Sequence, residues 1–269
     1  MDRIKGAIER AKAEQGGPSA TMGWAPRPLA DDLEQIEYRQ TRVVRLDPEQ
    51  LERHRIVSFD PTDSRCAVFD LLRTQVARSM REHGWRSLAV VSPTERCGKT
   101  FVAINLAASL AQQASQTVLL ADFDLRRPKI AEYLGLKCQH SLVELAERRA
   151  ELSSALVNPG IPRLVILPNS APVSRAAEFL TSTKARSLVS DLKAHYESRV
   201  VLFDLPPLLP NDDAISFLSQ VDCVLLVVTQ GLSTESDVKE SLRLLKPFHL
   251  LGTVLNKSDS TTKKYGKYY

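Results

Sequence analysis

Residues 90–100 read VVSPTERCGKT. An apolar run, residues 88–91, breaks here into a loop that ends in Gly-Lys-Thr, and a helix-like segment, residues 101–113, follows. A strand, a loop and a helix in this order turn backbone N–H groups toward an anion at the helix N-terminus. Lys99 would then reach the β- and γ-phosphates of a nucleotide, and the Thr100 hydroxyl would bind Mg²⁺. The stretch therefore predicts a phosphate loop.

The loop departs from the usual phosphate-binding motif. That motif opens with a glycine six residues before the lysine, where this chain has Pro93. Arg96 and Cys97 also stand where small residues are common. Because Gly-Lys-Thr alone often occurs by chance, further residues must support the nucleotide site.

Two later apolar runs end in carboxylates. Residues 118–128 read VLLADFDLRRP, and residues 200–207 read VVLFDLPP. In a parallel sheet, Asp122 and Asp204 would emerge at the same edge as the phosphate loop. Mg²⁺ prefers such oxygen ligands and bridges them to phosphates. These residues could instead only cap their strands, but two acidic motifs and a Gly-Lys-Thr in chain order favour a nucleotide site.

The rest of the chain indicates an α/β fold. Continuous apolar runs occur at residues 88–91, 118–121, 164–167, 200–203, 223–228 and 251–255. Such runs are typical of parallel strands covered on both faces. Helical stretches alternate with them, including residues 183–196 and 234–245, and residues 64–80 form an expected helix with Val68, Leu72 and Val76 on one face. We expect a doubly wound, mostly parallel sheet with helices on both faces, as in P-loop NTPases.

The expected domain organisation has three parts. Residues 61–257 form the nucleotide-binding domain, residues 1–60 an N-terminal helical and linker region, and residues 258–269 a flexible tail. The N-terminal region has a narrow apolar stripe at helical spacing, made of Ile4, Ala7, Ile8 and Ala11. This stripe would dock on the protein's own core or on a partner.

Composition narrows the function classes. The chain has 269 residues, 43% hydrophobic and 25% charged, which is ordinary for a globular protein. A net charge of +4 does not imply a nucleic-acid partner. The four cysteines lack zinc-site spacing, and the charged N-terminus does not read as a secretory signal. We therefore expect a cytoplasmic protein.

The order of the motifs resembles the bacterial tyrosine kinases (BY-kinases) of capsule and exopolysaccharide export, the CpsD/CapB group. These are P-loop proteins of the same broad class as the MinD/ParA ATPases. The resemblance covers residues 63–269, and Asp-x-Asp-x-Arg-Arg-Pro is its most specific part. It also includes LLRTQ at residues 71–75, AAEFL at 176–180 and GTVLNK at 252–257. MinD/ParA proteins usually carry a second lysine where this chain has Thr94, which favours the kinase branch.

The C-terminus supports the same branch. Of the six tyrosines, Tyr265, Tyr268 and Tyr269 fall in the last five residues, in a polar and basic segment. Such a segment cannot bury a core face, so its tyrosines are expected to be exposed phosphate acceptors. A terminal tag or a docking peptide is the alternative.

The proposed chemistry is phosphoryl transfer from ATP to tyrosine. Asp204 would anchor Mg²⁺, Asp122 would deprotonate the tyrosine hydroxyl, and Asp124 would support the metal shell. Arg126 would neutralise phosphate or pair with the acids. Asn256 would recognise adenine, as the resemblance suggests, or serve only as a strand-end turn residue. The residues expected to contact ATP are Thr94, Glu95, Arg96, Cys97, Gly98, Lys99, Thr100, Phe101 and Asn256, and the expected metal ligands are Thr100, Asp122 and Asp204.

The resemblance also implies partners. It implies a homo-oligomer, a separate membrane polysaccharide co-polymerase as activator, and a cognate tyrosine phosphatase. Many relatives build a ring of subunits with Glu-x-x-Arg-x-x-Arg, but aligned on Arg73 this chain has Ala67 and Asp70, which puts such a ring in doubt. Two rival functions stay open: a MinD/ParA-like ATPase, and a nucleotide-gated scaffold without kinase activity.

Overall fold

A computed structural model describes residues 41–113, 116–194 and 199–258. Within these ranges lies an eight-stranded sheet with the order β1-β4-β5-β3-β6-β2-β7-β8. Neighbouring strands run parallel except β4 and β5, which are antiparallel. The strands are β1 (Arg42–Val43), β2 (Ser87–Val91), β3 (Thr117–Asp122), β4 (Val157–Asn158), β5 (Leu164–Leu167), β6 (Arg199–Asp204), β7 (Cys223–Thr229) and β8 (Leu250–Asn256).

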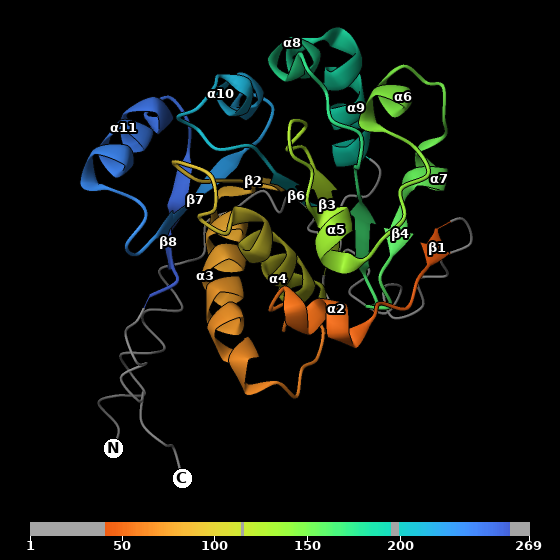
Figure 1. Ribbon diagram of the computed structural model, residues 1–269, viewed down its shortest axis with the longest axis horizontal. Coiled ribbons are helices and arrows are strands. Elements are labelled where there is room, and N and C mark those ends of the chain that lie inside the picture. The colour runs from red at the N-terminus through yellow and green to blue at the C-terminus, as the bar shows by residue number, and fades with distance from the viewer. Residues whose placement is uncertain (1–40, 114–115, 195–198, 259–269) are drawn as a thin grey trace, which may run out of the picture.

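Helices cover both faces of this sheet. Figure 1 shows α3 and α4 on one side of the strands and α9 and α10 on the other. This arrangement confirms the doubly wound α/β fold expected from the sequence. The helices are α2 (Pro48–Arg53), α3 (Ala67–His83), α4 (Lys99–Ala111), α5 (Ile130–Leu134), α6 (Leu142–Ala146), α7 (Leu152–Ala155), α8 (Ala176–Thr181), α9 (Thr183–Ala194), α10 (Asp213–Leu218) and α11 (Glu235–Leu245).

All six apolar runs predicted as strands are strands, namely β2, β3, β5, β6, β7 and β8. The first five are buried at every position, as expected of strands with helices on both faces. β8 lies at the edge of the sheet and is partly exposed. Strands β1 and β4 have two residues each, too few to produce a sequence pattern.

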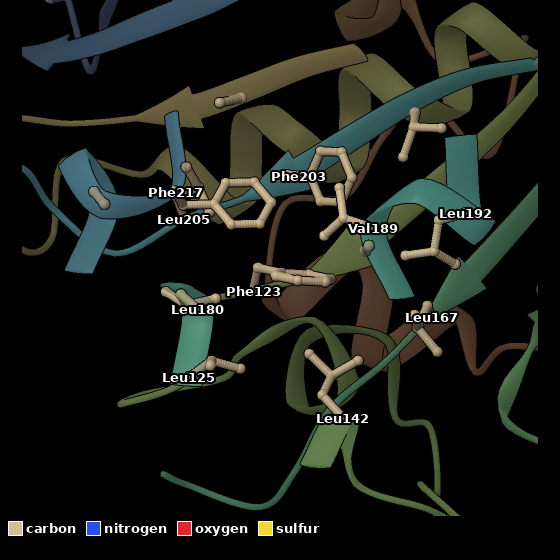
Figure 2. Packing of buried hydrophobic residues seen from close by; sticks show 14 of the residues in the cluster. Phe123, Leu125, Leu142, Leu167, Leu180, Val189, Leu192, Phe203, Leu205 and Phe217 are labelled. Carbon is tan, nitrogen blue, oxygen red and sulfur yellow. The ribbon is translucent and has the colours of Figure 1, made fainter. Parts of the chain in front are cut away.

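Aromatic packing fixes the strand ends that carry the acids. Phe123 and Phe203 pack edge to face with ring centroids 5.1 Å apart, and Phe217 of α10 packs on both (Figure 2). Phe123 directly follows Asp122, and Phe203 directly precedes Asp204. All three rings are fully buried, and losing one such side chain typically costs about 3–5 kcal/mol. The core therefore holds both carboxylates in place.

The helix predicted at residues 64–80 is α3, and the apolar residues expected on one of its faces are not all buried. Val76 is fully buried, whereas Val68 is 60% exposed. The buried residues are Phe69, Val76, Ala77 and Met80. Phe69 and Val76 are seven residues apart and so share a face, whereas Val68 lies about 80° away from Val76 at ~100° per residue.

The N-terminal part of the described chain packs on the domain. β1 pairs with β4, and Ile56 belongs to the core next to α4. The Asn105 side chain of α4 accepts hydrogen bonds from the backbone N–H groups of Val57 and Ser58, at 2.9 and 3.0 Å. Residues before residue 61 therefore pack on the nucleotide-binding domain. The stripe predicted at residues 4–11 and the tail tyrosines lie outside the described residues.

Candidate active site

The phosphate loop joins β2 to α4 and contains one position that requires glycine. Gly98 has φ +86°, which side chains rarely adopt, and a Cβ atom there would lie 2.2 Å from Asn256 Nδ2. Arg96 also has a positive φ of 63°, and its carbonyl accepts a hydrogen bond from Lys257 Nζ at 2.9 Å. The unusual loop residues are therefore accommodated by contacts from the strand-end residues 256–257.

Side chains from two strands hold the loop at Cys97. Its carbonyl accepts hydrogen bonds from Thr229 Oγ1 at 2.8 Å and from Asn256 Nδ2 at 2.9 Å. The Cys97 thiol is buried and lies 3.6 Å from Thr94 Oγ1, so it fills the loop interior. Asn256 lies beside the phosphate loop, and adenine recognition by it stays a prediction. The Phe101 ring packs edge to face on Phe69, with ring centroids 5.5 Å apart.

The predicted lysine and acids meet at one point. Lys99 Nζ donates to Asp124 Oδ2 at 2.7 Å and lies 3.6 Å from Asp204 Oδ1. Thr100 Oγ1 donates to Asp204 Oδ2 at 2.6 Å. Asp122 and Asp204 are opposite each other on the paired strands β3 and β6. The convergence of strand ends predicted from the sequence is therefore confirmed.

Burial and mutual repulsion change the acidity of this cluster. Burial, followed by the nearby Asp204 charge, raises the pKa of Asp122 well above its usual value. Burial also raises the pKa of Asp204 to about 6, although Lys99 and the Thr100 hydroxyl act in the opposite direction. Burial disfavours the Lys99 charge, but Asp204 and Asp124 outweigh it and keep the pKa of Lys99 above its usual value. The site therefore has an excess of negative charge that favours a cation.

The residues present fit a magnesium ion. Asp122 Oδ2 accepts hydrogen bonds from the backbone N–H groups of Lys129 and Ile130, both at 2.9 Å. Within the described ranges, Asp122 Oδ1 is buried without a hydrogen-bond partner, and so is Asp204 Oδ1. Such oxygens next to the Thr100 hydroxyl are ligands of the type Mg²⁺ takes, and Mg²⁺ needs few of them because it keeps several waters. Among the described residues, no group of three or more His, Cys, Asp or Glu side chains is arranged to hold a metal ion by itself.

The two arginines of the Asp-x-Asp-x-Arg-Arg motif have different partners. Arg126 makes a two-point ion pair with Asp213 of α10, through Nε to Oδ2 and through Nη2 to Oδ1. Asp213 is not one of the acids expected as partners of Arg126, so the roles stated for Arg126 stay predictions. Arg127 Nη1 instead pairs with Glu95 of the phosphate loop.

Sequence reasoning missed three residues of this site. Asp213, Arg127 and Lys257 each contact a predicted site residue, at Arg126, Glu95 and Arg96. Asp213 is distant in sequence, and no pattern indicates its pairing. Arg127 was part of the quoted motif, and its partner Glu95 was among the residues expected to contact ATP, so that pair left the clearest signal.

A family model described as an AAA domain matches residues 87–249, which is more than half of the chain. The chain belongs to this family. The match begins at β2 and ends just before β8, so it contains the phosphate loop and both acidic motifs. Over the described residues, no helix has the length and apolar composition needed to cross a membrane.

Its relatives include bacterial tyrosine kinases, which confirms the resemblance found in the sequence. The chain is 30% identical to tyrosine-protein kinase Etk of Escherichia coli K12 over 225 residues, 80% of this chain and 31% of Etk. It is 27% identical to tyrosine-protein kinase YwqD of Bacillus subtilis over 81% of this chain and 92% of YwqD. The chain thus spans less than a third of the longer curated relatives.

Solved structures of kinase domains also resemble this chain. The kinase domain of E. coli Etk matches with a TM-score of 0.70 and 28% identity, over 89% of this chain and 92% of that one. The septum site-determining protein MinD from Pyrococcus horikoshii, complexed with Mg-ADP, matches with a TM-score of 0.53 and 24% identity, over 65% and 72%. The MinD likeness concerns the fold alone. The more extensive likeness is to a kinase domain.

Proposed function

We propose that this chain is an ATP-dependent protein-tyrosine kinase that phosphorylates its own C-terminal tyrosines in trans. One observation carries the proposal: Lys99 and Thr100 meet Asp122, Asp124 and Asp204 at one sheet edge. The kinase relatives favour tyrosine as acceptor over water. The acceptors would be Tyr265, Tyr268 and Tyr269.

We propose one task for each side chain of this cluster. Lys99 would exchange its hydrogen bond with Asp124 for one with the β- and γ-phosphates, and Asp124 would then support the metal shell. Thr100 and Asp204 would hold Mg²⁺ directly and Asp122 through a water, and the ion when bound neutralises charge on the transferred phosphoryl group. Asp122 would orient the tyrosine hydroxyl and take its proton on Oδ1. A free tyrosine has a pKa of about 10, so a carboxylate with a raised pKa is a better match than an ordinary one.

The cellular context is part of the proposal. We propose a role in exopolysaccharide or capsule synthesis and export, in the cytoplasm at the inner face of the plasma membrane. A separate membrane co-polymerase would activate the kinase, and a cognate phosphatase would reverse its action. A homo-oligomer would use contacts other than the ring motif of relatives, because Arg73 is bonded within the chain to Asp70 and Ser109.

One experiment separates this function from its rivals. Purified protein is incubated with Mg²⁺ and ATP, phosphotyrosine is mapped by mass spectrometry, and ADP is measured by a coupled assay. We expect phosphotyrosine in the tail together with ADP release. ADP without phosphotyrosine would indicate a MinD/ParA-like ATPase, and neither product with intact nucleotide binding would indicate a scaffold.

A further inference from the structure

The adjacent arginines Arg126 and Arg127 differ in how firmly each is held. The Asp213 carboxylate that binds Arg126 is completely buried, so moving Arg126 would leave a buried charge without a partner. The Arg127–Glu95 pair is exposed, with 66% and 45% of the two side chains accessible to solvent. Water screens such pairs, and their contribution is small. Of the two guanidinium groups, that of Arg127 can therefore change partner at little cost.

The backbone and the side chain of Arg127 both lie next to the phosphate site. Its backbone N–H donates to Asp124 Oδ1 at 3.1 Å, while Asp124 Oδ2 accepts from Lys99 Nζ. The Asp124 carboxylate therefore accepts hydrogen bonds from both the Arg127 backbone and the predicted phosphate-binding lysine. Its guanidinium lies on Glu95, which belongs to the phosphate loop itself. The cation therefore lies beside the loop without being committed to a buried partner.

We propose that Arg127 is a ligand of the nucleotide phosphates and that Glu95 competes with those phosphates for its guanidinium. The inference rests on the proposed ATP site. A guanidinium fork matches phosphate oxygens in two-point geometry, and a phosphate group carries more negative charge than a carboxylate. Bound nucleotide would therefore draw Arg127 away from Glu95. Glu95 therefore lowers nucleotide affinity in this arrangement.

The test measures the dissociation constant of Mg²⁺ with a non-hydrolysable ATP analogue by titration calorimetry. It compares wild type, Glu95→Gln, Glu95→Gln/Arg127→Ala and the matched control Glu95→Gln/Lys129→Ala. Lys129 lies two residues from Arg127 and carries the same charge, but its side chain pairs with Glu132 of α5. The control therefore reports the loss of one positive charge near the site without the loss of the proposed ligand. Salt is kept at about 50 mM so that exposed charges are weakly screened.

We expect the Glu95→Gln variant to bind the ATP analogue about three- to fivefold more tightly than wild type, because the exposed ion pair that competes for Arg127 is lost. In that background, Arg127→Ala should weaken binding about tenfold or more, since a charge-assisted contact is lost, and Lys129→Ala should weaken it less than about twofold. Equal, small effects of the two alanine substitutions would overturn the inference, because Glu95 would then act through repulsion alone. Loss of binding in wild type would instead contradict the proposed ATP site.

Discussion

Replacing Lys99 with methionine is expected to lower ATP-dependent phosphorylation by about 100-fold or more, as the loss of a charged group aimed at a developing charge typically does. Lys99 Nζ lies 2.7 Å from Asp124 Oδ2 and 3.6 Å from Asp204 Oδ1. Ground-state nucleotide binding should weaken by about 1.5–3 kcal/mol for the lost charge-assisted contact. Calorimetry and a phosphotyrosine assay measure the two effects separately. Unchanged phosphorylation would contradict the phosphate-loop assignment.

The same substitution should also destabilise the folded protein in a pH-dependent way. Removing one partner of a buried charge cluster typically costs about 3–5 kcal/mol, because the remaining charges lose their compensation. The buried carboxyls of Asp122 and Asp204 have raised pKa values and can take up protons instead, so the loss should be smaller at pH 6 than at pH 8. Circular dichroism at both pH values checks this, with Lys239→Met of the exposed pair Lys239–Glu235 as the control.

Asp122→Asn is expected to change activity and stability in opposite directions. Transfer should slow by about 100-fold or more, as the loss of a general base commonly does. At pH 8 the folded protein should become more stable, because a buried carboxylate beside Asp204 is replaced by a neutral amide. The amide oxygen can still accept the hydrogen bonds from Lys129 and Ile130. For a chain of this size, each kcal/mol gained raises the melting temperature by about 2–4 °C.

The pH dependence of this gain follows from the direction of the pKa shift. The pKa of Asp122 is higher in the folded protein than in the unfolded chain, because of burial and Asp204. Above about pH 4 the folded protein therefore holds more protons than the unfolded chain, so the carboxyl's contribution to stability falls as pH rises through that range. The Asp122→Asn gain should be absent near pH 4 and largest at pH 8. A lower melting temperature at pH 8 would show that Asp122 is not under electrostatic strain.

Asp204→Asn provides the comparison. Asp204 accepts from the Thr100 hydroxyl and lies near Lys99, so its loss should weaken Mg²⁺-dependent nucleotide binding more than Asp122→Asn does. If calorimetry gave the reverse order, the metal and base roles of the two residues would have to be exchanged.

The sequence predicted the layered fold and the meeting of the motifs because both depend on local patterns. Buried parallel strands form continuous apolar runs, and their carboxyl ends share one edge, so Lys99, Asp122 and Asp204 could be placed together. The exposure of Val68 could not be predicted, since it depends on how α3 rotates against α4. The Arg126–Asp213 pair joins residues 87 positions apart in regions of no regular pattern. Such contacts arise only when the whole sheet has formed.

Transfer of phosphate between molecules tests the kinase proposal most directly. A Lys99→Met chain, which keeps its tail tyrosines, is mixed with an active chain in which Tyr265, Tyr268 and Tyr269 are all phenylalanine. After incubation with Mg²⁺ and ATP, mass spectrometry maps phosphotyrosine on each chain. We expect phosphate on the tail of the Lys99→Met chain at these three tyrosines. No phosphate on that tail, with ATP still hydrolysed by the active chain, would contradict the kinase function and favour a MinD/ParA-like ATPase.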